Sequence, residues 1–108
     1  MGDLLARFLP QFLAHARPHL AAVIGWITRR DPAERATIER RIHTLAGDAC
    51  LLGLTEVCSL GLDCERRIKR LVADSSEIDI EQVVAALRQL EQLIEGLEAA
   101  QASKAGAP

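Results

Sequence analysis

Apolar residues recur along most of this chain at the three- and four-residue spacing of an α-helix. Between residues 38 and 53 the apolar positions fall at steps of 4, 3, 4 and 3, which places them in one stripe facing a core. This stripe consists of Ile38, Ile42, Leu45, Ala49 and Leu52. His43 lies beside the stripe, so we expect its imidazole at the edge of the core. Gly47 follows one turn later, inside a helix where glycine costs about 1 kcal/mol relative to alanine. We interpret Gly47 as leaving space for a large partner to approach the backbone beside His43.

Three other segments show helical spacing, and the first of them contains two prolines. Residues 3–30 carry a long apolar stripe, with Asp3 placed to cap the helix. Pro10 and Pro18 each remove an N–H group and clash one turn back. We therefore expect a short helix, a kink, and a longer helix beginning near Pro18. Trp26 is expected to pack at one end of the helical core.

Start and stop signals divide the remaining chain into three helices. Asp31 followed by Pro32 predicts the beginning of the second helix, and Gly53 its end. The third helix is expected over residues 55–72, followed by a polar break at residues 74–76. Asp79 is expected to cap the fourth helix.

Together these elements predict an all-α protein. We expect residues 1–98 to form an antiparallel up-and-down four-helix bundle with a short or kinked N-terminal helix. Residues 99–108 are small and polar, and we interpret them as a flexible tail or linker. No strand pattern, phosphate-binding glycine loop or internal repeat competes with this interpretation.

Composition narrows the possible partners and the compartment. Hydrophobic residues make up 49% of the chain and the net charge is −2, so no basic field favours nucleic acid or an anionic membrane. The longest apolar run, residues 20–27, is too short to span a bilayer. We find no secretory signal pattern and expect a cytoplasmic protein.

Neither the cysteines nor the histidine pair predicts a metal site. Cys50, Cys58 and Cys64 are spaced by 8 and 6 residues, which matches no metal or redox motif, and we expect neither a metal nor a disulfide role for them. His15 and His19 are separated by one helical turn but lack a third ligand, so we interpret them as a surface pair.

His43 is the candidate for chemistry because its neighbours on the helix suit a reactive imidazole. A neutral imidazole is a competent nucleophile near neutral pH. Glu39, one turn earlier, can orient one ring nitrogen and leave the other free. Arg40 can help neutralise a negative group gained by the free nitrogen. The alternative is a half-buried histidine without function, satisfied by its neighbours.

The segment HTLAGDACLLGL, residues 43–54, resembles the signature of histidine-containing phosphotransfer (HPt) domains of bacterial two-component phosphorelays. The pattern of that family is His-x-Leu-Lys-Gly, with a second glycine ten residues after the histidine. His43, Leu45, Gly47 and Gly53 match it. The resemblance continues along the third predicted helix and covers about residues 8–97. The matching positions there are Leu54, Val57, Cys58, Leu60, Gly61, Cys64 and Glu65.

The resemblance implies a phosphorelay intermediate rather than a self-contained enzyme. His43 would be the phosphoacceptor, exchanging a phosphoryl group with the aspartate of a response-regulator receiver domain or receiving it from a sensor histidine kinase. It implies no cofactor on this domain, because Mg²⁺ is expected on the receiver. The supporting residues would be Glu39, Arg40 and Gly47, and the docking surface would comprise Ala46, Gly47 and Cys50 with parts of the first helix. We expect the isolated domain to be a monomer without a metal site. We expect neither nucleic acid nor a membrane as its partner.

One position departs from the family pattern. Ala46 stands where the family has lysine, a residue expected to balance the charge of phosphohistidine. Arg40 or a residue of the third helix can substitute for that lysine. The alternative is a degenerate interaction module that binds a receiver or kinase without phosphotransfer. A helical oligomerisation domain is a third interpretation, weakly supported by Leu93 off the main apolar face of the fourth helix.

Overall fold

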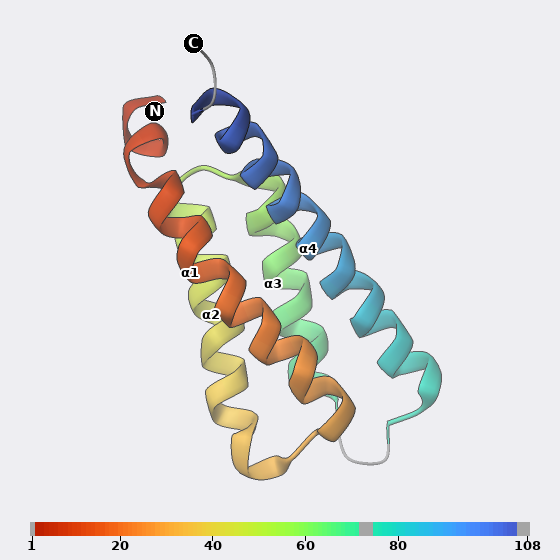
Figure 1. The fold of residues 1–108 in the computed structure, drawn as a ribbon. Helices are drawn as coiled ribbons and strands as arrows, with labels where there is room; N and C mark the ends of the chain where they lie inside the picture. The colour runs from red at the N-terminus through yellow and green to blue at the C-terminus, as the bar shows by residue number, and fades with distance from the viewer. Residues whose placement is uncertain (1, 72–74, 106–108) are drawn as a thin grey trace.

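The computed structural model describes residues 2–71 and 75–105, with the backbone alone at residues 2, 3, 104 and 105, and these residues form a bundle of four helices (Figure 1). The helices are α1 (Gly2–Arg29), α2 (Arg35–Leu51), α3 (Thr55–Arg70) and α4 (Glu77–Ala105), with a 3₁₀ turn at Pro32–Glu34 before α2. Helices α1 and α3 each pack against both α2 and α4, and the bundle measures 52 × 21 × 20 Å. This confirms the predicted four-helix bundle.

The core runs along the whole bundle axis and contains residues from all four helices. The predicted stripe of α2 is buried at Ile38, Ile42, Leu45 and Ala49, and its last member, Leu52, is half-buried against the core. Trp26 is buried near the end of α1, where its indole N–H donates to the Asp31 carbonyl at 2.9 Å. Its predicted position at the end of the core is confirmed.

Helix α1 does not begin again near Pro18. It is one helix of 28 residues that contains both Pro10 and Pro18, so the predicted short helix followed by a second start is wrong. Both prolines are exposed, as are Ala6 and Ala14, whose carbonyls lie one turn before them. Because these residues lie on the exposed side of α1, water can take the place of the missing N–H donors.

The end of α2 follows the predicted signal, whereas the predicted start signal belongs to the turn before the helix. The Asp31 side chain accepts from the Ala33 N–H at 3.0 Å and caps the 3₁₀ turn that begins at Pro32, so α2 itself begins only at Arg35. At the other end Gly53 adopts a left-handed φ of 75°, and the Leu54 N–H donates to the Ala49 carbonyl at 3.0 Å. This arrangement is a Schellman cap, which reverses the chain into α3.

The predicted cap of α4 is wrong by three positions. Ser76 caps the helix, because its hydroxyl oxygen accepts from the Asp79 N–H at 3.2 Å. Asp79 lies within the first turn, where a carboxylate interacts favourably with the helix dipole. The Asp74 part of the predicted polar break, like the Asp3 side chain expected to cap α1, lies outside the described residues.

Helix α4 also continues to Ala105, past the predicted boundary between bundle and tail at residues 98 and 99. Whether residues 99–108 act as a flexible tail or linker stays a prediction. Among the described residues, no helix is long and apolar enough to cross a membrane.

Candidate functional site

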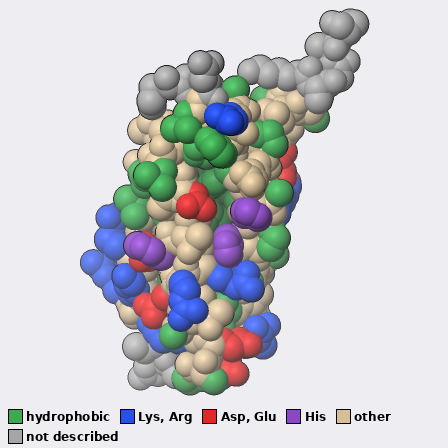
Figure 2. Space-filling model, turned by 90° about the vertical axis from the view of Figure 1, so that its left-hand side faces the viewer, with side chains coloured by type: hydrophobic (Ala, Val, Ile, Leu, Met, Phe, Trp, Pro, Cys, Tyr) green, Lys and Arg blue, Asp and Glu red, His purple; other side chains and the backbone are tan. Residues whose placement is uncertain are grey.

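His43 projects from the middle of α2 into solvent. Its side chain is 70% exposed, although Ile42 beside it is fully buried. Figure 2 shows this side of the bundle, with histidine side chains near the middle, hydrophobic side chains towards one end and basic side chains towards the other. An imidazole so placed is accessible to a macromolecular partner.

The δ nitrogen of His43 is held by Glu65 of α3. His43 Nδ1 lies 2.9 Å from Glu65 Oε2, and the Glu65 side chain is only 10% exposed. Glu65 is the one polar or charged residue that is buried in the described part of the chain. Because an ionised carboxylate only accepts hydrogen bonds, a neutral His43 in this contact carries its proton on Nδ1. The lone pair of Nε2 is therefore free.

A lysine completes the group of charges. Lys69 Nζ lies 3.2 Å from Glu65 Oε2, the same oxygen that faces His43. Glu65 and Lys69 are one helical turn apart on α3, and the Lys69 side chain is 56% exposed. Glu65 therefore lies between an exposed imidazole and an exposed ammonium group.

The structure assigns the orienting contact to Glu65 and not to Glu39, so that part of the sequence interpretation is corrected. Glu39 Oε2 instead lies 3.9 Å from Arg35 Nε, one turn earlier on α2. Arg40 is exposed one turn before His43. Its role in neutralising charge stays a prediction.

Glu65 is not predicted from the sequence as the orienting residue, because it enters that prediction only as a position that matches the family pattern. A signal was present. Glu65 follows Gly61 by one turn and precedes Ile68, both on the buried face of α3, so a charged side chain stood at a core position. A buried carboxylate requires a partner, and an exposed histidine on the neighbouring helix is such a partner.

Ala46 does not belong to the docking surface, contrary to the prediction. It is fully buried, and it packs against Gly61 of α3 so closely that a Cβ at Gly61 would lie 2.9 Å from the Ala46 Cβ. The reason is the angular position of residue 46, which faces α3 instead of solvent. Gly61 thus allows α2 and α3 to approach closely beneath His43.

Gly47 shows the opposite environment. A Cβ built at Gly47 has no neighbour within 4 Å, so no contact within the bundle requires glycine there. Its position one turn after exposed His43 agrees with the interpretation that it keeps the approach to the imidazole open.

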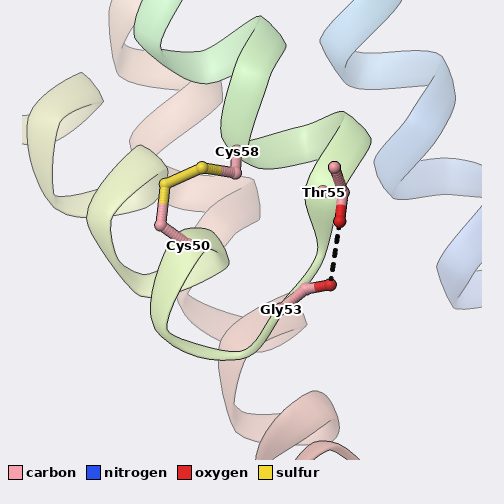
Figure 3. The surroundings of a disulfide bond; sticks show 4 residues. All are labelled: Cys50, Gly53, Thr55 and Cys58. Atoms are coloured by element: carbon pink, nitrogen blue, oxygen red, sulfur yellow. Dashed lines mark hydrogen bonds between the residues drawn. A yellow bond between two sulfur atoms is a disulfide. The ribbon is translucent and has the colours of Figure 1, made fainter.

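Cys50 and Cys58 form a disulfide, which corrects the expectation that the cysteines have no such role (Figure 3). The Schellman cap turns α3 back along α2, which brings the two Cα atoms to 4.8 Å. Spacing alone did not reveal the pair because the turn at Gly53 creates the proximity. Cys64 is a buried free thiol, and burial raises its pKa to about 12, so it is unreactive.

An apolar groove lies between α1 and α2, towards the α2–α3 turn. Two large hydrophobic side chains at the groove are exposed, Leu51 at 78% and Phe8 at 38%. The groove is lined by Phe8, Gln11, Phe12 and His15 of α1, by Asp48 and Leu51 of α2, and by Leu52 directly after α2.

The other histidines lie on α1 and form no metal site. Arg41 donates to His19 Nδ1 at 3.4 Å, and burial together with the Arg41 charge lowers the pKa of His19. Among the described residues, no group of three or more His, Cys, Asp or Glu side chains is placed to hold a metal ion.

The sequence was compared with known protein families, curated proteins and solved structures. The sequence matches the Hpt domain over residues 7–102, nearly the whole chain. No curated protein and no solved structure matches the sequence.

Proposed function

The chain belongs to the Hpt family, and on that premise we propose that His43 is its phosphoacceptor, exchanging a phosphoryl group with the aspartate of a response-regulator receiver domain. Hpt domains serve phosphorelay histidine phosphotransfer and interact with receiver domains and kinases. The observation that carries the proposal is the pairing of an exposed imidazole with a buried carboxylate at Nδ1, a contact that in the neutral ring leaves the Nε2 lone pair free.

The chemistry requires little beyond this pair. The Nε2 lone pair attacks the phosphorus of phospho-aspartate, an N–P bond forms, and the bond from phosphorus to the acyl oxygen breaks to release the carboxylate. Attack by a neutral imidazole leaves a positive charge on the ring, and Glu65, which accepts from Nδ1–H at 2.9 Å, stabilises that charge. The reverse step returns the phosphoryl group to a receiver aspartate. The receiver supplies its own Mg²⁺.

A docking face for the receiver surrounds the imidazole. We define it as His43, Gly47 and Leu51, which recur at every fourth residue of α2, with Phe8 and the groove beside them on α1. Exposed Leu51 and Phe8 supply apolar area, and Gly47 keeps the region beside the imidazole low. Cys50 is exposed on the same face of α2. A cytoplasmic location, where phosphorelay partners operate, is part of the proposal.

The test is a transfer assay with a panel of receiver domains loaded by acetyl phosphate. Acid-labile phosphate is followed on the wild type, on His43→Gln and, as a control at a histidine outside the docking face, on His19→Gln. We expect label on the wild type and on His19→Gln, and none on His43→Gln. Label that survives in His43→Gln contradicts the assignment.

The second candidate function is an interaction module without phosphotransfer. It is favoured by one observation, the absence of the motif lysine at Ala46. Calorimetry that detects binding of a receiver to the wild type, together with a transfer assay that detects no label on it, supports this alternative.

A further inference from the structure

We propose that Lys69 replaces the absent motif lysine and, acting through Glu65, lengthens the lifetime of the phosphoryl group on His43. This inference rests on the proposed function. The motif position cannot supply the charge, because residue 46 is alanine and is buried against α3. The cation comes instead from the neighbouring helix, where Lys69 Nζ lies 3.2 Å from the carboxylate oxygen that holds His43.

Lys69 is the basic residue of α3 that is available for this role. Arg66 and Arg67 are paired with Asp63, at 3.1 and 2.8 Å. Arg35, which approaches from α2, donates to the backbone carbonyls of Ile68 and Lys69. Lys69 alone among these cations has an ion pair with Glu65.

The charges of the phosphorylated site explain why a cation is needed. A phosphoryl group on Nε2 adds about two negative charges to a site that already contains the Glu65 carboxylate. The N–P bond breaks most readily when the ring is protonated, because a neutral imidazole then leaves. Glu65 favours that protonated ring by accepting from Nδ1–H. Lys69, bound to the same oxygen, weakens the pull of Glu65 on the ring and offsets part of the added charge.

Lys69 is thus a positioning residue, and its removal is expected to make phospho-His43 shorter-lived. The probe is phosphoramidate, which requires no protein partner. Nε2 attacks its phosphorus, the N–P bond to His43 forms, the P–N bond to the departing ammonia breaks, and the label is assigned to His43 by its loss in His43→Gln. After the donor is removed, water cleaves the N–P bond, and the decay is followed by ³¹P NMR.

We expect Lys69→Met to shorten the half-life about two- to fivefold, the ratio typical of an ion pair at the surface. Lys69→Arg keeps the positive charge and is expected to show the half-life of the wild type. Arg70→Met, which removes the neighbouring charge on the side of α3 that faces α4, is the matched control and is expected to leave the half-life unchanged. In a Glu65→Gln background, Lys69→Met is expected to have no further effect, because the carboxylate through which it acts is gone.

Each contrary outcome has a distinct meaning. If phospho-His43 forms and decays at the wild-type rate in Lys69→Met, the role of Lys69 is overturned and the proposed function stands. An equal effect of Lys69→Met with and without Glu65 overturns the route through Glu65. If His43 takes no label from phosphoramidate, the proposed function fails and this inference fails with it.

Discussion

Helix α3 carries Asp63 and Glu65 two residues apart, and the two carboxylates differ in exposure and in the groups that contact them. Asp63 lies towards α4, is 31% exposed and is paired with Arg66 and Arg67 of its own helix. Glu65 lies towards α2, is 10% exposed and is paired with an imidazole across the helix interface and with Lys69.

The difference separates a structural ion pair from a candidate functional one. The cations at Asp63 are guanidinium groups that stay charged at any pH the fold tolerates. Glu65 instead faces His43, whose free nitrogen is exposed to partners and whose charge changes during the proposed reaction. A buried carboxylate that holds an exposed imidazole is therefore a stronger sign of function than the number of ion pairs on a helix.

Neutralising each carboxylate in turn should give the largest difference between Glu65 and Asp63. We expect Glu65→Gln to slow phosphoryl acceptance by His43 about 10- to 100-fold, the usual effect of losing a partner that orients a reactive histidine. Asp63→Asn should leave that rate unchanged within about twofold, because Asp63 contacts neither His43 nor Glu65 among the interactions found. Initial rates of labelling from phosphoramidate measure both. Equal losses in the two variants would contradict the distinction.

Reduction of the Cys50–Cys58 disulfide, which joins α2 to α3, should lower the free energy of unfolding of the bundle. The bond links residues 8 apart, and closing so short a loop in the unfolded chain corresponds to about 2–3 kcal/mol of stability. We expect denaturant unfolding with and without dithiothreitol to differ by that amount. Cys64→Ala should preserve the difference, because Cys64 is outside the disulfide. A Cys58→Ala variant that still loses stability on reduction would argue against the pairing.

Alanine substitutions at two glycines should have opposite effects on stability, because Gly61 lies in the close contact between α2 and α3 and Gly96 has open space around it. Gly61→Ala should destabilise the bundle by about 1–3 kcal/mol, because its Cβ would lie 2.9 Å from the Cβ and 3.2 Å from the Cα of Ala46. Gly96→Ala, where an added Cβ meets nothing within 4 Å, should stabilise α4 by up to about 1 kcal/mol. Urea unfolding of the two variants gives both values. A stabilising Gly61→Ala would show that the helices are not in close contact there.

The smallest expected effect is that of Asp63 on stability. Hydrogen bonds from Arg67 and Arg66 lower the pKa of Asp63, so its ionised form stabilises the folded state above the ordinary pKa of the carboxyl. That contribution is lost as the pH falls through the lowered pKa. Asp63→Asn should therefore cost less than about 1 kcal/mol at pH 7, and the two proteins should converge in acid. A stability difference between the two proteins that grows as the pH falls would contradict the lowered pKa of Asp63.

The sequence predicted those features that depend on local spacing. Helical periodicity located all four helices, Asp31 marked the 3₁₀ turn that leads into α2, Gly53 marked the end of α2, and His43 was placed at the edge of the core. Pro10 and Pro18 misled the prediction of α1 because their cost depends on whether the carbonyls one turn earlier are buried. The residues that carry those carbonyls, Ala6 and Ala14, are on the exposed face, which only the packed bundle defines.

The features that were missed all depend on contacts between helices. Glu65 reaches His43, and Cys50 reaches Cys58, only because the turn at Gly53 sets α3 against α2 in one register. The same register buries Ala46 against Gly61 and so removes it from the predicted docking surface. Spacing along a single helix favoured Glu39 as the orienting residue, since it describes neighbours within a helix and not across two.

The identity of the phosphorylated nitrogen tests the central claim most directly. The protein, with ¹⁵N-labelled histidines, is phosphorylated by phosphoramidate, and ³¹P–¹⁵N couplings identify the atom bonded to phosphorus. Because Glu65 accepts from Nδ1–H, we predict that phosphorus is bonded to Nε2 of His43. Phosphorus on Nδ1 of His43, or on His15 or His19 with His43 unmodified, would contradict the account.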